Sequence, residues 1–208
     1  FSDEQLHFLH RRHTAEQSRR AVRLLRDAGI GNISIDLMYG FPGESLDDWH
    51  RDIIHALRLK PEHVSAYALM YEEGTPLYRM MQQGLVSEAD EELSLQMYSD
   101  LLRLLGNAGY EHYEISNFAR LKCGNARPAG GGSFRSLHNS NYWNHTPYLG
   151  IGAAAHSFDG RERRWNVSDV QAYIDGMEQG IPLFERESID DDTRYNEQVM
   201  TALRTSEG

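Results

Sequence analysis

Helix-like and strand-like segments alternate through the first 120 residues, and this alternation restricts the fold more than any other feature. Apolar residues recur at helical spacing over residues 13–29, again from Ser45, and over residues 87–109. Between them, residues 32–40, 62–74 and 110–119 read as strands. Helices that alternate with strands are typical of a parallel sheet with crossover helices. The sequence therefore predicts an α/β fold.

Capping signals define two of the predicted helices. Thr14 with Gln17, and Ser45 with Asp48, have the spacing of capping boxes. Each predicted helix should bury one apolar stripe. The expected stripes are Ala21, Leu24, Leu25 and Ala28 in the first helix, Trp49, Ile53, Ala56 and Leu57 in the second, and Leu93, Met97, Leu101 and Leu104 in the third.

The first predicted strand places one carboxylate in an informative position. Its large apolar residues face one way, whereas Ser34, Asp36 and Met38 face the other. In a parallel barrel that second face is the interior, near the mouth where binding sites form. Asp36 could accept hydrogen bonds from ribose hydroxyls. A solvent-facing aspartate on a half-exposed strand explains the pattern equally well.

The remaining segments have less regular patterns. Residues 123–133 are rich in Gly, Pro and Ser and predict a flexible loop, in which a functional role for Cys123 is improbable. The segment "YLGIGAAAHSF" (148–158) predicts a buried strand or tight turn, with so many small residues that a ligand or another backbone must approach closely. "ERRWNV" (162–167) predicts a short strand, and helices should begin near Ser168 and Asp190.

Three polar positions have both a binding and a structural interpretation. Arg11, in "RRH", suits bidentate capture of a carboxylate but is also typical of a solvated helix end. His156 is either a ligand contact or a packed side chain. In "HNSNYW", His138 and Tyr142 share a face if the segment is helical. The segment is then either an aromatic wall of a binding site or a loop whose polar groups are all hydrogen-bonded. The histidine spacing fits no standard zinc site.

Composition excludes several functional classes. The formal net charge of −10 argues against a general nucleic-acid surface. One cysteine cannot hold an iron–sulfur cluster or a structural zinc ion, and it favours a reducing, cytoplasmic location. No apolar run approaches a membrane span, and no signal peptide is visible. Because the chain starts at Phe1, we interpret it as a piece of a longer protein.

Seven segments in order resemble one protein family. They are "SIDLMYGFPG", "HVSAYALMYEEGTPLY", "YEISNFAR", "HNSNYW", "YLGIGAAAHSF", "RRWN" and "YNEQVMTALRTSEG". Together they resemble the radical S-adenosylmethionine (SAM) proteins related to oxygen-independent coproporphyrinogen III oxidase, and most closely their heme-chaperone (HemW) branch. The resemblance implies that residues 1–120 form the C-terminal half of a partial parallel (β/α) TIM-like barrel. Residues 121–133 would be an inserted loop that relatives lack, and residues 134–208 a small α+β extension.

The resemblance also implies cofactors and site residues. Arg11 matches a position expected to hold the SAM carboxylate, and Asp36 one expected to bind its ribose. Met70 matches a position that lines the adenine pocket, where its face, with Val64, Ala66 and Ala68, should leave room for a flat ring. His156 falls near a further SAM contact. A [4Fe–4S] cluster would be bound by cysteines upstream of this chain and would reduce SAM to a 5′-deoxyadenosyl radical.

The same resemblance implies a ligand and leaves three functions open. The "HNSNYW" residues His138, Asn139, Tyr142 and Trp143 become candidate contacts for heme or another porphyrin. The leading hypothesis is a heme-binding protein that delivers heme to acceptor proteins. The alternatives are a coproporphyrinogen III oxidase, which decarboxylates propionate side chains, and a cluster-free module without chemistry. Exposed sheet edges would favour pairing with a second copy or poor solubility.

Overall fold

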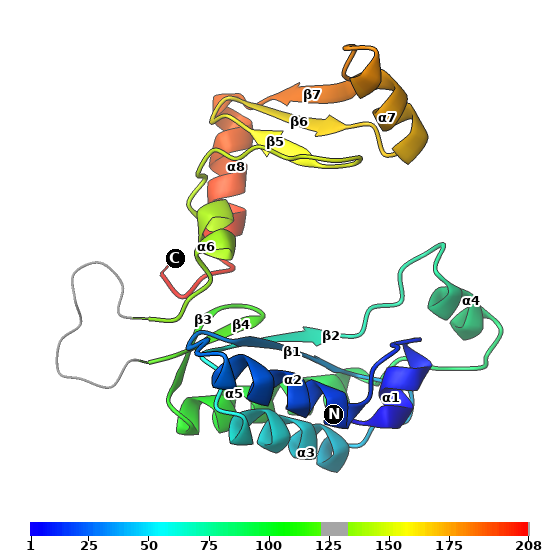
Figure 1. The fold of residues 1–208 in the computed structure, drawn as a ribbon, viewed down its shortest axis with the longest axis vertical. Coiled ribbons are helices and arrows are strands. Elements are labelled where there is room, and N and C mark those ends of the chain that lie inside the picture. Colours follow the sequence, from blue (N-terminus) through cyan, green and yellow to red (C-terminus); the bar gives the residue numbers. More distant parts are fainter. Residues whose placement is uncertain (122–132, 208) are drawn as a thin grey trace. The chain divides into compact units, whose positions relative to one another are not determined.

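The computed structural model describes residues 1–121 and 133–207, which form two compact units, Phe1–Arg135 and Ser136–Gly208 (Figure 1). Most of the predicted inserted loop, including Cys123, lies outside the described residues. An antiparallel bridge joins Leu121 to Ser133 on either side of it.

The first unit contains one sheet with helices packed against it. Its helices are α1 (Asp3–Phe8), α2 (Ala15–Asp27), α3 (Leu46–Arg58), α4 (Pro76–Gln82) and α5 (Glu91–Asn107). Its strands are β1 (Ser34–Tyr39), β2 (His63–Ala68), β3 (Tyr110–Glu114) and β4 (Asn117–Arg120). The sheet order is β1-β2-β4-β3, and α2, α3 and α5 lie on the same side of it (Figure 1).

The crossover between the first two strands confirms the predicted βαβ unit. β1 and β2 pair in parallel, with Asp36 opposite Ser65, and α3 connects them. The third predicted strand, residues 110–119, is instead a hairpin of β3 and β4. β4 pairs antiparallel with β2 and lies between β2 and β3. The sheet is thus parallel between β1 and β2 and antiparallel beyond them.

A buried carboxylate accounts for the hairpin. Glu114 is 3% exposed and accepts a hydrogen bond from the Ser116 backbone N–H at 3.2 Å. It also accepts one from the Asn117 side-chain amide. Because a buried carboxylate needs several donors, it holds the chain in a turn just where the apolar alternation would allow a strand to continue.

The core lies between the sheet and helices α3 and α5. Both capping boxes are present, and Trp49, Ile53 and Ala56 of α3 are fully buried, as predicted. Met97 and Leu101 of α5 are also fully buried, whereas the predicted Leu93 and Leu104 are only partly so. The remaining member of the α5 face is Leu105, which is buried where the prediction placed Leu104.

The prediction for α2 is wrong. Leu24 and Leu25 are 55% and 38% exposed, and Val22 is buried instead. The rotation of the helix follows from one ion pair, because Arg26 contacts the buried carboxylate of Glu62 at 2.7 Å. That contact directs the Val22 face to the sheet and leaves the leucines outside.

The second unit is a three-stranded antiparallel sheet with three helices. Its elements are α6 (Leu137–Trp143), β5 (His156–Phe158), β6 (Glu162–Asn166), α7 (Val170–Glu178), β7 (Phe184–Ser188) and α8 (Asp191–Ala202), with strand order β5-β6-β7. The helices α7 and α8 begin close to where the sequence predicted them. β7 was not predicted, because all five of its residues are exposed and its sequence does not alternate apolar with polar residues.

The small-residue segment ends in a close approach between two backbones, one of the two outcomes that the sequence predicted. A Cβ atom added at Gly150 would clash with the His156 carbonyl oxygen. Only glycine fits there.

Among residues 1–121 and 133–207, no helix is long and apolar enough to cross a membrane.

Candidate functional site

A helix-ending motif places Arg11 beside the sheet. The His10 N–H bonds to the His7 carbonyl at 2.9 Å, and the Arg11 N–H bonds to the Leu6 carbonyl at 2.8 Å. This is the Schellman pattern, in which the residue after the C-cap is left-handed and usually glycine. Here that residue is His10, with φ of 53°. A non-glycine residue in this conformation stores strain, which often marks a functional site.

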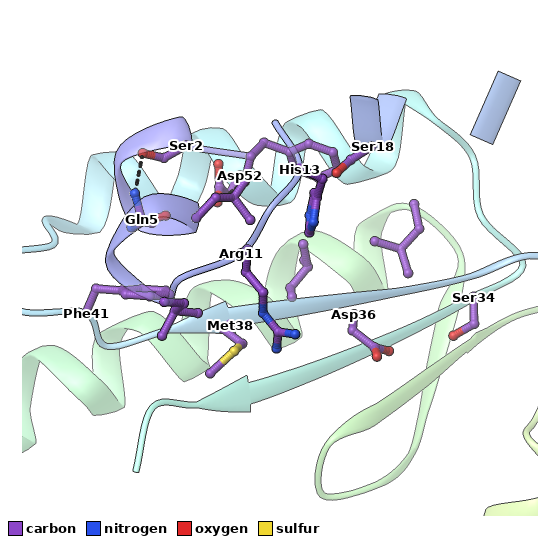
Figure 2. Close-up of a pocket in the computed structure, with 15 residues that line it drawn as sticks. Ser2, Gln5, Arg11, His13, Ser18, Ser34, Asp36, Met38, Phe41 and Asp52 are labelled. Atoms are coloured by element: carbon purple, nitrogen blue, oxygen red, sulfur yellow. Dashed lines mark hydrogen bonds and ion pairs between the residues drawn. The ribbon is translucent and has the colours of Figure 1, made fainter. Parts of the chain in front are cut away.

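Arg11 and Asp36 line the same pocket. Figure 2 shows the Arg11 side chain reaching toward β1, with its guanidinium between Asp36 and Met38. The cavity holds about 400 Å³ and also touches Ser34 and Phe41. No ion pair joins Arg11 to Asp36 in the part of the chain that the structure describes. A cation and a carboxylate thus face one space from positions 25 residues apart in the sequence.

One wall of this pocket continues into a buried hydrogen-bonded chain. The Ser34 hydroxyl lies 2.9 Å from His63 Nδ1, and His63 Nε2 lies 2.8 Å from the Tyr113 hydroxyl. Burial lowers the pKa of His63, and the nearby Asp36 carboxylate opposes that shift in part. The imidazole is therefore held in its neutral form.

A second buried carboxylate fixes the loop that follows β1. Glu44 accepts hydrogen bonds from the backbone N–H groups of Gly40 at 2.7 Å and Phe41 at 3.1 Å. The Gln5 side chain of α1 donates a third at 2.9 Å. Burial raises the pKa of Glu44, and these three hydrogen bonds lower it by less. Glu44 thereby ties Phe41, which lines the pocket, to helix α1.

Met70 lies in the same unit but away from this pocket. It follows β2 by two residues, is 69% exposed, and lines a separate cavity of about 310 Å³ beside Tyr39 and Gly40. Of the three residues expected to leave room for a flat ring, Ala68 lines that cavity with Met70. The expectation is wrong for Val64 and Ala66. Both pack in the core against the helices, because β2 turns its even-numbered residues to that side.

The "HNSNYW" segment forms helix α6 and contributes to a cavity of about 480 Å³ in the second unit. Tyr142 and Trp143 line this cavity with Tyr148 and Phe158. The Arg204 guanidinium lies 4.8 Å from the centre of the Trp143 ring. The Trp143 indole N–H is buried and has no hydrogen-bond partner among the described residues. The cavity therefore offers aromatic faces and a cation.

His138 and Asn139 do not line that cavity. The His138 ring packs edge-on against Tyr142, with 5.0 Å between ring centres, as the predicted spacing of four allows. The Tyr142 ring in turn packs against Tyr148 at 4.9 Å. His138 thus supports an aromatic wall from behind.

His156 begins β5 in the second unit and stacks on Trp165, with ring centres 5.8 Å apart. Its backbone pairs with that of Trp165 across the two strands. The stacking on Trp165 agrees with the packed-side-chain interpretation, but His156 is exposed, so the packing covers only part of it. The expected contact with SAM stays a prediction.

Two residues of the pocket region were missed by the sequence analysis, His63 and Glu44. A signal for His63 exists, because "HVSAY" alternates polar and apolar residues and so places His63 and Ser65 on the face of Asp36. Glu44 carries no such signal. No group of three or more His, Cys, Asp or Glu residues could hold a metal ion within residues 1–121 and 133–207.

Comparison with known proteins adds three relationships. The chain is 33% identical over 209 residues to the heme chaperone HemW of Bacillus subtilis (strain 168), covering all of this chain and 52% of that protein. It is 36% identical over 154 residues to the mitochondrial radical S-adenosyl methionine domain-containing protein 1 of Bos taurus, covering 74% of this chain and 32% of that protein. The third is to a solved structure, that of the coproporphyrinogen III oxidase HemN of Escherichia coli, a radical SAM enzyme.

The fold of that structure matches over nearly the whole chain. Its TM-score is 0.75 at 16% identity, covering 99% of this chain and 48% of that one. This likeness supports the predicted fold class, a partial α/β barrel with a small extension. No protein-family model matches the chain. The chain spans about half the length of the curated relatives that it matches over all of its residues.

Proposed function

We propose that this chain supplies SAM- and heme-binding residues to a longer heme chaperone. The chain belongs to the radical SAM family related to oxygen-independent coproporphyrinogen III oxidase, and it matches the heme chaperones of that family. Its residues 1–120 would form the C-terminal half of the SAM barrel, and residues 134–208 the extension that contacts heme. A cytoplasmic location also stays a prediction.

One observation carries the SAM proposal: Arg11 and Asp36 line a single pocket. Arginine pairs bidentately with a carboxylate, and an aspartate accepts hydrogen bonds from vicinal ribose hydroxyls. SAM carries both groups, so the charges of the pocket suit it. In this proposal Arg11 holds the carboxylate, Asp36 orients the ribose, and the loop tied down by Glu44 shields the site from water. The SAM contacts expected of Met70 and His156 stay predictions, because Met70 lines a separate cavity and His156 belongs to the second unit.

The cluster would come from elsewhere in the longer protein. Cys123 is the one cysteine of the sequence, so this chain does not contain the ligands of a [4Fe–4S] cluster. When bound, the cluster and SAM would supply one-electron radical chemistry. The part of the chain described here would bind and orient SAM without ligating the metal.

The heme proposal rests on the cavity beside α6. Heme is a flat aromatic ligand with two carboxylates, and it needs aromatic faces and cationic partners. Tyr142 and Trp143 provide the faces, and Arg204 provides a cation for a carboxylate. His138 and Asn139 would act indirectly, by holding Tyr142 in place.

Titration of the full-length protein with hemin tests this proposal. We expect binding of one heme per chain and no decarboxylation of coproporphyrinogen III. Tyr142→Leu should weaken heme binding, whereas Tyr195→Leu, a change of an exposed tyrosine on α8, should not. Equal effects of the two substitutions would remove the α6 cavity from the proposal.

Two alternatives make different predictions. A coproporphyrinogen III oxidase would decarboxylate its substrate, and Asp36→Asn would abolish SAM turnover. The fold likeness to the Escherichia coli oxidase keeps this alternative open. A cluster-free module would bind neither iron nor SAM. Iron analysis of the full-length protein separates the third possibility from the first two.

A further inference from the structure

The hydrogen-bonded chain of Ser34, His63 and Tyr113 begins at an exposed residue in the pocket wall and continues through two buried residues. Ser34 is exposed and lines the pocket that contains Arg11 and Asp36. His63 and Tyr113 are only 5% and 3% exposed. Their hydrogen bonds, at 2.9 and 2.8 Å, connect the pocket wall to the interior of the sheet.

The chemistry of the three groups selects one proton arrangement. A neutral imidazole donates from one nitrogen and accepts at the other. The phenol of Tyr113 is more acidic than the hydroxyl of Ser34, so it is the better donor to the accepting nitrogen. Tyr113 therefore donates to Nε2, and Nδ1–H donates to the Ser34 oxygen. The Ser34 hydrogen is then left to point elsewhere, and donation from His63 strengthens it as a donor.

The surroundings of His63 support this arrangement. Ser34 and Asp36 face it from β1, Tyr113 from β3, and its backbone partner on β4 is Ala119, which has no polar side chain. Burial lowers the pKa of His63, so the ring keeps one accepting nitrogen at neutral pH.

We propose that Ser34 is a ligand-positioning residue, whose hydroxyl donates a hydrogen bond to an acceptor atom of the nucleoside part of SAM, and that His63 and Tyr113 fix it in this donor orientation. The inference rests on the proposed function, because it places the ribose at Asp36. Ser34 precedes Asp36 by two residues on the same face of β1, about 7 Å along the strand. That spacing brings the neighbouring part of the nucleoside within its reach.

Equilibrium binding of SAM to the full-length protein tests the proposal. Ser34→Ala should weaken SAM binding about threefold to tenfold, the loss of one hydrogen bond between uncharged groups. Ser34→Thr keeps the hydroxyl and should bind within about twofold of the unmodified protein. Tyr113→Phe should weaken binding by about twofold to fivefold, because His63 can then adopt either tautomer.

A double-mutant cycle separates positioning from stability. If Tyr113 acts through Ser34, Tyr113→Phe should add nothing to the binding loss in a Ser34→Ala background. Tyr98→Phe is the matched control, because Tyr98 also bonds a histidine, His112, at 3.3 Å, but outside this pocket. The control should leave SAM affinity unchanged.

The possible failures are distinguishable. If Asp36→Asn abolishes SAM binding while Ser34→Ala does not change it, the inference about Ser34 is wrong and the proposed SAM site stands. Strictly additive losses in the cycle would also overturn the role of His63 and Tyr113. If Asp36→Asn leaves SAM binding intact, the proposed function fails first. Ser34 is exposed, so its variants should fold.

Discussion

Replacing Glu62 with glutamine should destabilise the first unit strongly. Glu62 is 3% exposed and bridges two arginines, Arg26 at 2.7 Å and Arg120 at a shorter contact. The Ile33 backbone N–H donates a third hydrogen bond at 3.0 Å. Glutamine has the same shape but one acceptor oxygen, so its amide N–H₂ group would face one of the guanidinium groups.

The expected loss follows from these contacts. Leaving a fully buried charge without its partner costs about 3–5 kcal/mol. Both arginine side chains are about one third exposed, at 30% and 34%, so water replaces part of the lost interaction. We therefore expect Glu62→Gln to cost about 2–3 kcal/mol, and the melting temperature to fall by roughly 4–12 °C for a chain of this size.

Thermal unfolding of the protein measures this effect, with Glu16→Gln as the matched control. Glu16 also contacts two arginines, Arg19 and Arg23, but its side chain is 66% exposed. Exposed ion pairs contribute little, so the control should change the stability by less than about 1 kcal/mol. Similar shifts for the two variants would refute the reasoning that burial makes the Glu62 cluster important.

Three further predictions concern the pocket frame and the second unit. Burial raises the pKa of Glu44 above its ordinary value of 4.5, so the native state binds the proton more tightly than the unfolded state does. The stability should therefore fall as the pH rises from 4.5 through the raised pKa. Glu44→Gln should flatten this part of a stability–pH profile. His10→Gly should relieve the left-handed strain and raise stability by about 1 kcal/mol in urea unfolding, whereas an unchanged midpoint would show that no strain is stored there. Gly150→Ala should destabilise the second unit by about 1–3 kcal/mol or more, because the added methyl meets the His156 carbonyl, while Gly106→Ala in α5 meets nothing within 4 Å and should be neutral or stabilising in the same calorimetric scan.

Local rules determined much of this fold, and buried charges account for two of its departures. The capping boxes and the Trp49 face of α3 follow from spacing alone, so they were predictable. The turn after Glu114 was not predictable, because the surrounding apolar pattern is also that of a continuous strand. The orientation of α2 was not predictable either, because it depends on the Glu62 carboxylate, whose partner Arg26 is remote in sequence. A pattern of apolar residues reports which face can be buried, but it does not report which charge must be satisfied.

The same limit applies to the pocket. The sequence identified Asp36 from the alternation of β1, and Arg11 from its resemblance to a family position. Their common pocket depends on the Schellman turn at His10. Such a turn is usually recognised by its glycine, so the sequence does not predict it here. His63 could have been found from the alternation of β2. Its bond to Tyr113 spans 50 residues and could not.

The structure of the full-length protein with SAM bound would test the central claim most directly. The account predicts the SAM carboxylate within hydrogen-bond distance of the Arg11 guanidinium, and the ribose hydroxyls within hydrogen-bond distance of the Asp36 carboxylate. SAM bound in another cavity of the protein, with Arg11 and Asp36 free of contact, would contradict it.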